Sequence, residues 1–190
     1  FLIGVNEEGY QGQDLINNAS CTTNCIAPVA EIIDKAFGID KAMMTTIHAY
    51  TAEQNLVDGP PPGGKSNDLR RARAAAENII PSSTGASKAI PLLFPELEGK
   101  VDGYSIRVPV PDGSLAIITA AIEKRVSKED LNRMIYAAAG QVEWRWGKIL
   151  KTTDQPLVSS DIIGTEYGSL VDLGTTSVID GHMVTIGAWY

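Results

Sequence analysis

Two side chains of this sequence have the chemistry of a nucleophile and of its proton acceptor. Cys21 lies in the stretch "NNASCTTNCIAP", among small hydroxyl and amide residues and just before apolar residues at helical spacing. At a helix N-terminus, the dipole and the free backbone amides favour a thiolate and any oxyanion beside it. His48 ends an apolar segment and precedes the polar "AYTAEQ", a position that displays a base. The two residues predict covalent catalysis by a cysteine, and the alternative is a structural role for each.

The other cysteine of this stretch, Cys25, is interpreted as a small buried hydrophobic residue on the helix. A disulfide with Cys21 is disfavoured, because a helical turn supplies poor geometry for it. Zinc is disfavoured as well, since the soft ligands are only Cys21, Cys25, His48 and His182, without a CxxC pair. No metal is expected, and His182 is assigned no role.

The helix that follows the thiol has two interpretations. Apolar residues at helical spacing fill 26–37, and Gly38 follows them. Pro28 fits best in a first helical turn, which predicts a start near Ala27 and a thiol in the preceding loop. Alternatively, the helix begins near Thr22 and the proline kinks it.

A third group of residues is basic. Arg70, Arg71 and Arg73 follow the Pro- and Gly-rich loop 57–68, and Arg107 interrupts an apolar strand pattern in "SIRVPVP". The planar guanidinium binds phosphate through paired donors, and the hydroxyl and amide groups of "PSSTGA" suit the same ligand. An anion site is therefore predicted, and the alternative is a solvated helix face for the first three arginines.

The elements that position these residues predict an α+β domain. Alternating and β-branched runs indicate a largely antiparallel, mixed sheet, and amphipathic segments indicate helices packed on one of its faces. The tripeptide Pro111-Asp112-Gly113 is expected to join two strands that pair antiparallel, and Asp180-Gly181 to form a hairpin. Helices are expected over 68–80 and 127–140, and strands over 41–48, 103–110, 114–124, 169–174, 175–179 and 182–190.

Composition restricts the classes of function. The 190 residues are 44% hydrophobic, enough for one sizeable core, so one domain is expected. The formal net charge of -7 opposes binding to nucleic acid and to anionic membranes, but a local basic cluster can still bind a phosphate-bearing small molecule. No apolar run is long enough to span a bilayer. With two cysteines and no targeting signal, a reducing compartment and hence a cytoplasmic location are expected.

Five stretches, in the order "NASCTTNC", "HAYTAEQ", "RAAAENIIPSSTGASKA", "RVPVP" and "AWY", carry a family resemblance. The sequence resembles phosphorylating glyceraldehyde-3-phosphate dehydrogenases of the bacterial and eukaryotic type through nearly all of its 190 residues. The resemblance implies that 1–190 correspond to the catalytic (substrate) domain of that family. The N-terminal Rossmann domain and the C-terminal helix of the family are expected to be absent from this chain, which has no G-x-G-x-x-G fingerprint.

The resemblance also implies a role for each site residue. Cys21 corresponds to the nucleophile and His48 to the base that activates it. The site for the substrate's phosphate is implied to contain Thr51, Arg70 and Arg107, with Arg71 as a substitute for Arg70 because the preceding loop differs in length from the family's usual spacing. The site for inorganic phosphate is implied to contain Ser20, Thr22, Thr84, Gly85 and Arg107.

The activity implied by the resemblance is the oxidative phosphorylation of glyceraldehyde 3-phosphate to 1,3-bisphosphoglycerate through a cysteine thioester, in glycolysis or gluconeogenesis. The cofactor is NAD or NADP, and the residue that distinguishes them lies in the nucleotide-binding domain of the family. A homotetramer is implied for the full enzyme, and this chain alone is expected to be inactive. The alternatives are an erythrose-4-phosphate dehydrogenase and a non-catalytic fragment or interaction module.

Overall fold

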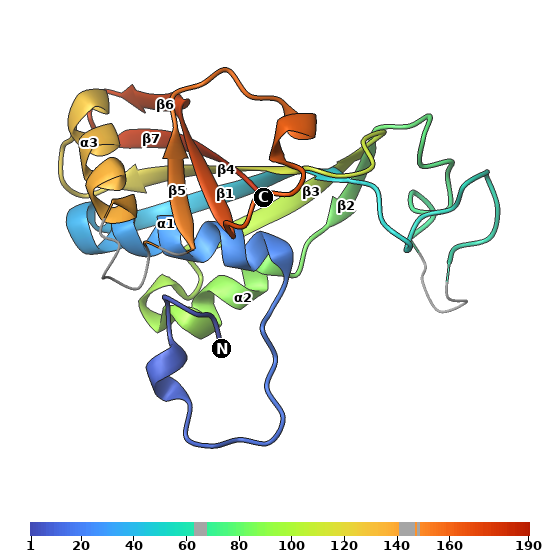
Figure 1. Ribbon diagram of the computed structural model, residues 1–190, viewed down its shortest axis with the longest axis horizontal. Coiled ribbons are helices and arrows are strands. Elements are labelled where there is room, and N and C mark those ends of the chain that lie inside the picture. Colours follow the sequence, from blue (N-terminus) through green and yellow to red (C-terminus); the bar gives the residue numbers. More distant parts are fainter. Residues whose placement is uncertain (63–67, 141–146, 148) are drawn as a thin grey trace.

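A seven-stranded mixed sheet forms the centre of the molecule in the computed structural model, which describes residues 1–190 apart from 63–67, 141–146 and 148 (Figure 1). The strand order is β2-β3-β1-β4-β7-β6-β5. The strands are β1 (Ile39–Ala49), β2 (Ile80–Ser83), β3 (Val101–Val108), β4 (Leu115–Ile122), β5 (Leu150–Thr153), β6 (Ser169–Ile179) and β7 (Met183–Trp189). The α-helices of the described residues are α1 (Cys21–Phe37), α2 (Ala86–Leu93) and α3 (Lys128–Ala139), and short 3-10 turns lie at Glu7–Gly9, Pro95–Leu97 and Ser159–Ile162.

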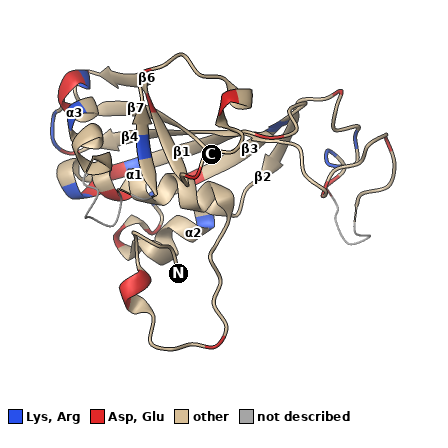
Figure 2. Ribbon diagram, in the orientation of Figure 1, with Lys and Arg blue, Asp and Glu red and all other residues tan. Residues whose placement is uncertain are grey.

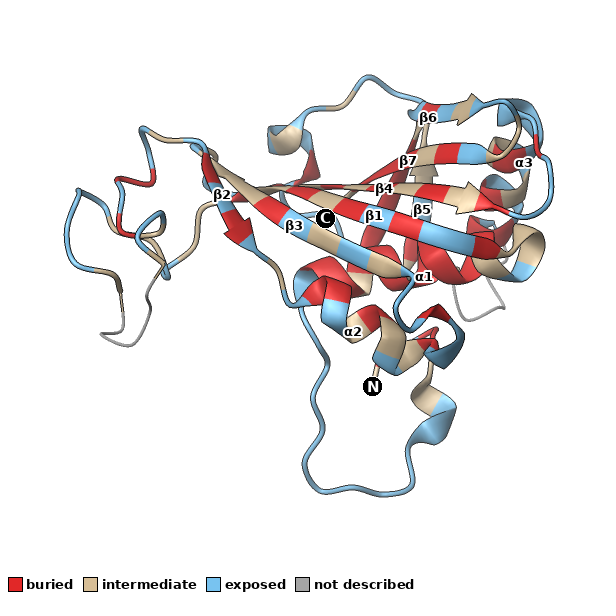
Figure 3. Cartoon of the chain, turned by 180° about the vertical axis from the view of Figure 1, so that it is seen from behind, coloured by how far each residue is buried: buried red, intermediate tan, exposed pale blue. Residues whose placement is uncertain are grey.

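The helices pack on one face of this sheet, which confirms the predicted α+β class. Helix α1 contacts β4 and β6, α2 contacts β3, and α3 contacts β5 and β6. Seen from behind, the strands lie in front of α1 and α2 and alternate between buried and more exposed residues (Figure 3). The core therefore lies between the sheet and the helices, where the side chains of α1 such as Ile26, Val29 and Ile33 are almost fully buried.

Helix α1 begins at Cys21, as in the second of the two interpretations. Ser20 caps it, since the Ser20 Oγ accepts a hydrogen bond from the Thr23 backbone N–H at 3.1 Å. Pro28 lies inside the helix and is buried, and Gly38 ends the helix with a φ of 72°. The cap and the buried apolar face outweigh the single backbone hydrogen bond that the proline cannot donate.

The predicted antiparallel pairing of the two strands on either side of Pro111-Asp112-Gly113 is wrong. Strand β1 lies between them, parallel to β3 and antiparallel to β4. The connection between β3 and β4 instead closes over the end of β1, because the Ser114 Oγ accepts a hydrogen bond from the Ala49 N–H at 3.1 Å. The long apolar run of β1 thus has a partner on both edges, as a central strand requires.

The predicted helix over 68–80 is also wrong. Residues 68–79 form turns, and several of their backbone groups pair with the preceding loop instead of continuing a helical ladder. Asn55 N–H donates to the Arg71 carbonyl at 3.3 Å, and Ala75 N–H donates to the Asn55 carbonyl at 2.9 Å. Tertiary pairing therefore overrides the helical propensity of the alanine-rich stretch. Helix α2 and strands β2 and β5 were not predicted.

The C-terminal half agrees more closely with the predicted elements. Ser127 caps α3 through a hydrogen bond from the Asp130 N–H to its Oγ at 3.0 Å, as the capping-box spacing indicates. Asp180 and Gly181 both have positive φ values, 49° and 71°, and turn β6 into β7 as a hairpin. The two strands expected over 169–179 are one strand, β6, with a shift of register within it.

Charged residues of both signs are dispersed over the described part of the chain (Figure 2). Among the described residues, no helix is both long and apolar enough to cross a lipid bilayer.

Candidate active site

One cleft of about 490 Å³ brings together most of the residues singled out in the sequence. It lies where the N-termini of α1 and α2 meet the ends of β1 and β3. The predicted site residues that line it are Ser20, Cys21, Thr22, His48, Thr51, Thr84, Gly85 and Arg107. Residues separated by more than eighty positions in the chain thus form one concave, polar surface.

Cys21 is the first residue of α1, and its side chain is exposed to the cleft. The backbone amides of a first helical turn have no partner within the helix, and they carry the positive end of the helix dipole. Ser20 satisfies one of these amides, that of Thr23, through its Oγ. The helix therefore presents the thiol together with donors that can stabilise an oxyanion beside it.

His48 lies opposite the thiol, near the end of β1. Its Nε2 is 3.6 Å from the Cys21 Sγ, within reach of a hydrogen bond to sulfur. Burial lowers the pKa of His48 below 6.5, the positive charge of Arg107 lowers it further, and a hydrogen bond with the Ala49 carbonyl opposes the shift. The imidazole is therefore neutral at pH 7 and can accept a proton from the thiol.

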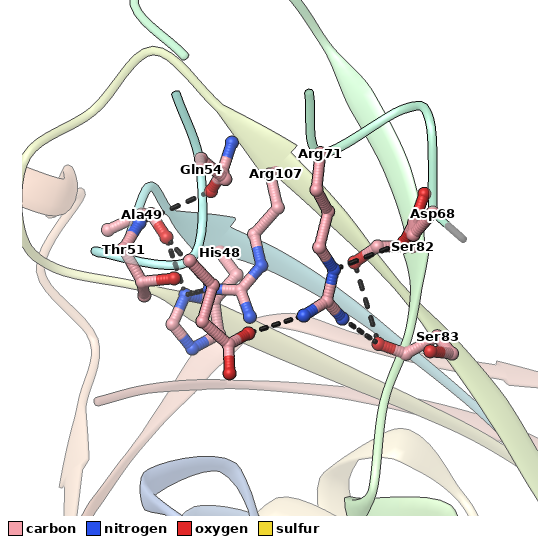
Figure 4. A network of polar contacts seen from close by, with 10 residues as sticks. His48, Ala49, Thr51, Gln54, Asp68, Arg71, Ser82, Ser83 and Arg107 are labelled. Atoms are coloured by element: carbon pink, nitrogen blue, oxygen red, sulfur yellow. Dashed lines mark hydrogen bonds and ion pairs between the residues drawn. The ribbon is translucent and has the colours of Figure 1, made fainter. Parts of the chain in front are cut away.

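Arg107 lies directly beside His48, because the two residues are register partners in the parallel pair of β1 and β3. Figure 4 shows the guanidinium next to the imidazole ring. The Arg107 Nη1 is 2.7 Å from the Nδ1 of His48 and 3.1 Å from the Ala49 carbonyl oxygen. The same Nδ1 is 2.7 Å from the Ala49 carbonyl, so the arginine and the carbonyl compete to set the protonation of that nitrogen.

Arg71, and not Arg70, is the second arginine of the cleft. Its guanidinium pairs with the carboxylate of Glu53, with the Asp68 carboxylate at 3.1 Å and with the Ser83 carbonyl at 3.3 Å (Figure 4). Arg70 lines a separate hollow beside Ser83 and does not line the cleft. The structure thus brings Arg71 to the site in place of Arg70.

The two arginines of the cleft raise its positive potential. Burial lowers the pKa of Arg107, the neighbouring charge of Arg71 lowers it further, and the carboxylate of Glu53 opposes the shift. Thr84 and Gly85 lie at the start of α2, so that a second helix N-terminus opens on the same space. Two cations and two helix N-termini around one cleft suit an anion such as phosphate.

Cys25 is structural, as its spacing on the helix predicts. The residue is fully buried, and burial raises the pKa of its thiol to about 12. Its Sγ lies 3.6 Å from the Ala188 carbonyl oxygen of β7. Both cysteines are free thiols. The described residues contain no group of three or more His, Cys, Asp or Glu side chains that could hold a metal ion.

Sequence reasoning missed several residues that the fold places at the site. Glu53 and Ser105 line the cleft, and Tyr190 contacts His48. Ser105 could have been predicted, since it precedes Arg107 by two positions and so lies on the same face of its strand. The positions of Glu53 and Tyr190 depend on the loop 51–79 and on the strand order, which no local pattern specifies.

The arrangement suits nucleophilic attack by a thiol on a carbonyl compound that carries an anionic group. The exposed thiol and the neutral imidazole supply the nucleophile and the base. The arginines and helix N-termini supply binding energy for the anionic part of the substrate and for a developing oxyanion.

Comparison with known proteins points to one family. Residues 20–190 match the family model described as glyceraldehyde 3-phosphate dehydrogenase, C-terminal domain. Over all 190 residues the chain is 53% identical to a glyceraldehyde-3-phosphate dehydrogenase of Mycolicibacterium smegmatis and 52% identical to one of Mycobacterium avium, covering 53% of each. It is 50% identical to the protein of the same name from Haloarcula vallismortis, covering 54% of it. The chain thus spans about half the length of the curated relatives it matches, and it belongs to the glyceraldehyde 3-phosphate dehydrogenase C-terminal domain family.

Proposed function

We propose that this chain supplies the thiol chemistry of a phosphorylating glyceraldehyde-3-phosphate dehydrogenase, in which Cys21 and His48 convert an aldehyde and inorganic phosphate into an acyl phosphate. The distance of 3.6 Å between the Cys21 Sγ and the His48 Nε2, at the N-terminus of α1, is the observation that carries this proposal. The names of the relatives support the substrate, glyceraldehyde 3-phosphate, and the proposed product of its oxidation and phosphorylation is 1,3-bisphosphoglycerate.

The first half of the reaction forms a bond between the sulfur and the aldehyde carbon. His48 takes the thiol proton, the Cys21 Sγ attacks the carbonyl, and the amides of the first turn of α1 stabilise the oxyanion of the resulting hemithioacetal. NAD or NADP supplies the acceptor for the hydride that leaves the hemithioacetal carbon. The proton that His48 took from the thiol passes to this oxyanion, and when the carbon is oxidised to a thioester on Cys21, the same proton returns from the hydroxyl to His48.

The second half of the reaction breaks the thioester. Inorganic phosphate, held by Arg107 together with Thr84 and Gly85, attacks the thioester carbon. The bond to sulfur breaks and releases the acyl phosphate, and Cys21 recovers a proton from His48. The imidazole thus accepts a proton from the thiol and later returns one to it. A lowered pKa suits this exchange, because the imidazole is neutral before the reaction begins.

The two anions are assigned to two groups of residues that share Arg107. Ser20, Thr22, Thr84, Gly85 and Arg107 are proposed to bind the attacking phosphate, and Thr51 and Arg107 the phosphate of the substrate. Arg71 replaces Arg70 in this proposal, because only Arg71 reaches the cleft.

The residues of this chain fit only the reacting end of a nicotinamide cofactor. The exposed thiol at the start of α1 offers a place beside Cys21 for a planar ring. The described sheet has four antiparallel and two parallel pairings and lacks the parallel, doubly wound order that binds dinucleotides. We therefore propose that another domain of a longer, cytoplasmic and homotetrameric protein binds most of the cofactor, and that this chain alone has no dehydrogenase activity.

The experiment is an assay of the full-length enzyme with glyceraldehyde 3-phosphate, phosphate and either cofactor. Cys21→Ser is expected to abolish activity, whereas Cys25→Ser, a matched change of a buried thiol, is expected to retain it. A Cys21→Ser enzyme with normal turnover would overturn the proposal. Erythrose 4-phosphate as a competing substrate tests the nearest enzymatic alternative, and an enzyme that turns over neither aldehyde would favour a non-catalytic module.

A further inference from the structure

Tyr190 contacts His48 and Thr22, the residue that follows Cys21 in the chain. Its hydroxyl is 2.8 Å from the Thr22 Oγ1, in the first turn of α1 and next to Cys21. Its ring meets the ring of His48 edge to face, with the centroids 5.7 Å apart and the planes at 80°. One side chain therefore connects the element that carries the thiol with the side chain that carries the base.

The hydroxyl of Tyr190 also has a partner on the strand that carries the base. It hydrogen bonds with Thr46, two positions before His48 on β1. The Thr46 Oγ1 in turn donates to the Ser105 Oγ of β3 at 2.8 Å. Thr22 and Thr46 are 4% and 0% exposed, so water does not replace these hydrogen bonds. The phenol thus belongs to a buried chain of hydroxyl groups that joins α1, β1 and β3.

The backbone of Tyr190 is fixed independently of its side chain. Its N–H donates to the Ser114 carbonyl at 2.9 Å, and the Ser114 N–H donates to the Tyr190 carbonyl at 2.8 Å. The Ser114 Oγ accepts the hydrogen bond from Ala49, the residue after His48. Removing the phenolic oxygen therefore leaves the ring in place, because the main chain still holds it.

The phenol does not titrate in the working range of the enzyme. Burial raises the pKa of Tyr190 above 10, its ordinary value, and the hydrogen bond with Thr22 only partly offsets this. The group is therefore a neutral hydrogen-bonding bridge rather than an acid or a base.

We propose that Tyr190 is a positioning residue that fixes the distance between the Cys21 Sγ and the His48 Nε2, by holding Thr22 with its hydroxyl and the imidazole with its ring. This inference rests on the proposed thiol chemistry. It assigns Tyr190 no contact with substrate, because the residue acts through its two neighbours.

The test is the alkylation rate of Cys21 by iodoacetamide in the full-length enzyme, measured over a range of pH together with the melting temperature. Tyr190→Phe is expected to lower the rate at neutral pH by about threefold to tenfold, the effect of one hydrogen bond, without a comparable fall in thermal stability. Tyr136→Phe removes the same oxygen from an exposed position on α3 and is expected to change neither quantity. Identical pH profiles of alkylation for Tyr190→Phe and wild type would overturn the inference.

A double-mutant cycle separates positioning from a general loss of packing. Thr22→Val removes the same hydrogen bond from the other side, so that Tyr190→Phe is expected to cause no further loss of alkylation rate in that background. Independent, multiplying losses would contradict the bridge. Labelling of the wild-type enzyme separates this inference from the proposed function. Equal labelling of Cys21 and Cys25 in the wild type would contradict the proposed thiol chemistry itself. Selective labelling of Cys21 at a rate that Tyr190→Phe leaves unchanged would contradict only the positioning role of Tyr190.

Discussion

The Arg107 Nη1 lies 2.7 Å from the His48 Nδ1, the ring nitrogen on the far side from the thiol. A cation in this position disfavours a second proton on the imidazole and leaves the Nε2 directed at the Cys21 Sγ, 3.6 Å away. The arginine therefore lines the proposed phosphate site and also lowers the pKa of the proposed base. Its substitution is expected to affect both functions.

Arg107→Lys keeps the positive charge but loses the planar pair of donors. The substitution is expected to lower kcat/KM by about tenfold to hundredfold, the range for loss of a charge-assisted hydrogen bond. Steady-state kinetics of the full-length enzyme measure this. Arg125→Lys, at an exposed arginine paired with Asp180, provides the control and is expected to have wild-type kinetics.

The pair Arg70 and Arg71 offers a comparison between neighbouring residues. Arg71→Ala is expected to raise the KM for a phosphate-bearing ligand by about tenfold or more, since a partly buried charged donor is lost. Arg70→Ala is expected to change this KM by less than about twofold, because substitutions of exposed side chains usually have small effects. The measurement is KM for inorganic phosphate and for the aldehyde. A larger effect of Arg70→Ala would show that the loop adopts another register in the working enzyme.

His48 makes folding stability dependent on pH. Its folded pKa is lower than 6.5, so below pH 6.5 the unfolded chain binds a proton that the folded protein does not. The free energy of unfolding is therefore unaffected by this group above pH 6.5, and it decreases as the pH falls from 6.5 towards the lowered pKa of His48 in the folded protein. Denaturant unfolding of wild type and His48→Gln at several pH values tests this, and the variant is expected to lose less stability on acidification. Equal pH slopes for the two proteins would contradict the expectation.

Two serines perform the same structural task at different places. Ser20 caps α1 and Ser127 caps α3, so replacing either with alanine is expected to lower the free energy of unfolding by about 1 kcal/mol. Only Ser20 borders the thiol, and only Ser20→Ala is expected to slow the alkylation of Cys21 by iodoacetamide. If Ser127→Ala slows it equally, then the rate reports global stability and not the local cap.

Gly113 is required by the turn that leads into Ser114. Its φ is 78°, and a Cβ atom there would lie 2.1 Å from the Ser159 carbonyl oxygen. Gly113→Ala is expected to cost at least about 1–3 kcal/mol from backbone strain alone and to displace Ser114 from Ala49 and Tyr190. The melting temperature and the activity of the full-length enzyme are expected to decrease together. Gly99→Ala is the matched control, because Gly99 also has a positive φ but has open space around it and lies far from the site.

The chemistry of the site was more predictable from the sequence than its geometry. Cys21 beside a helix start, His48 at a strand end and Arg107 in an apolar strand are local patterns, and the fold brings all three into one cleft. The choice between Arg70 and Arg71 was not predictable, because it depends on a loop whose backbone pairs with residues 55–59. No local signal specifies such pairing.

The fold shows the same division between local and distant information. The caps at Ser127 and Gly38 and the hairpin at Asp180-Gly181 follow from rules that act within a few residues. The insertion of β1 between β3 and β4 was missed, because adjacency in sequence favours direct pairing and only the whole sheet decides otherwise.

This strand order also determines when the site can come into being during synthesis. A ribosome releases the chain from its N-terminus, so β1, with His48 on it, emerges long before either of its neighbours. Its partners β3 and β4 begin at Val101 and Leu115, and β7 ends at Trp189. A nascent chain that already contains both Cys21 and His48 therefore keeps both edges of β1 unpaired until β3 and β4, which end at Val108 and Ile122, have been translated.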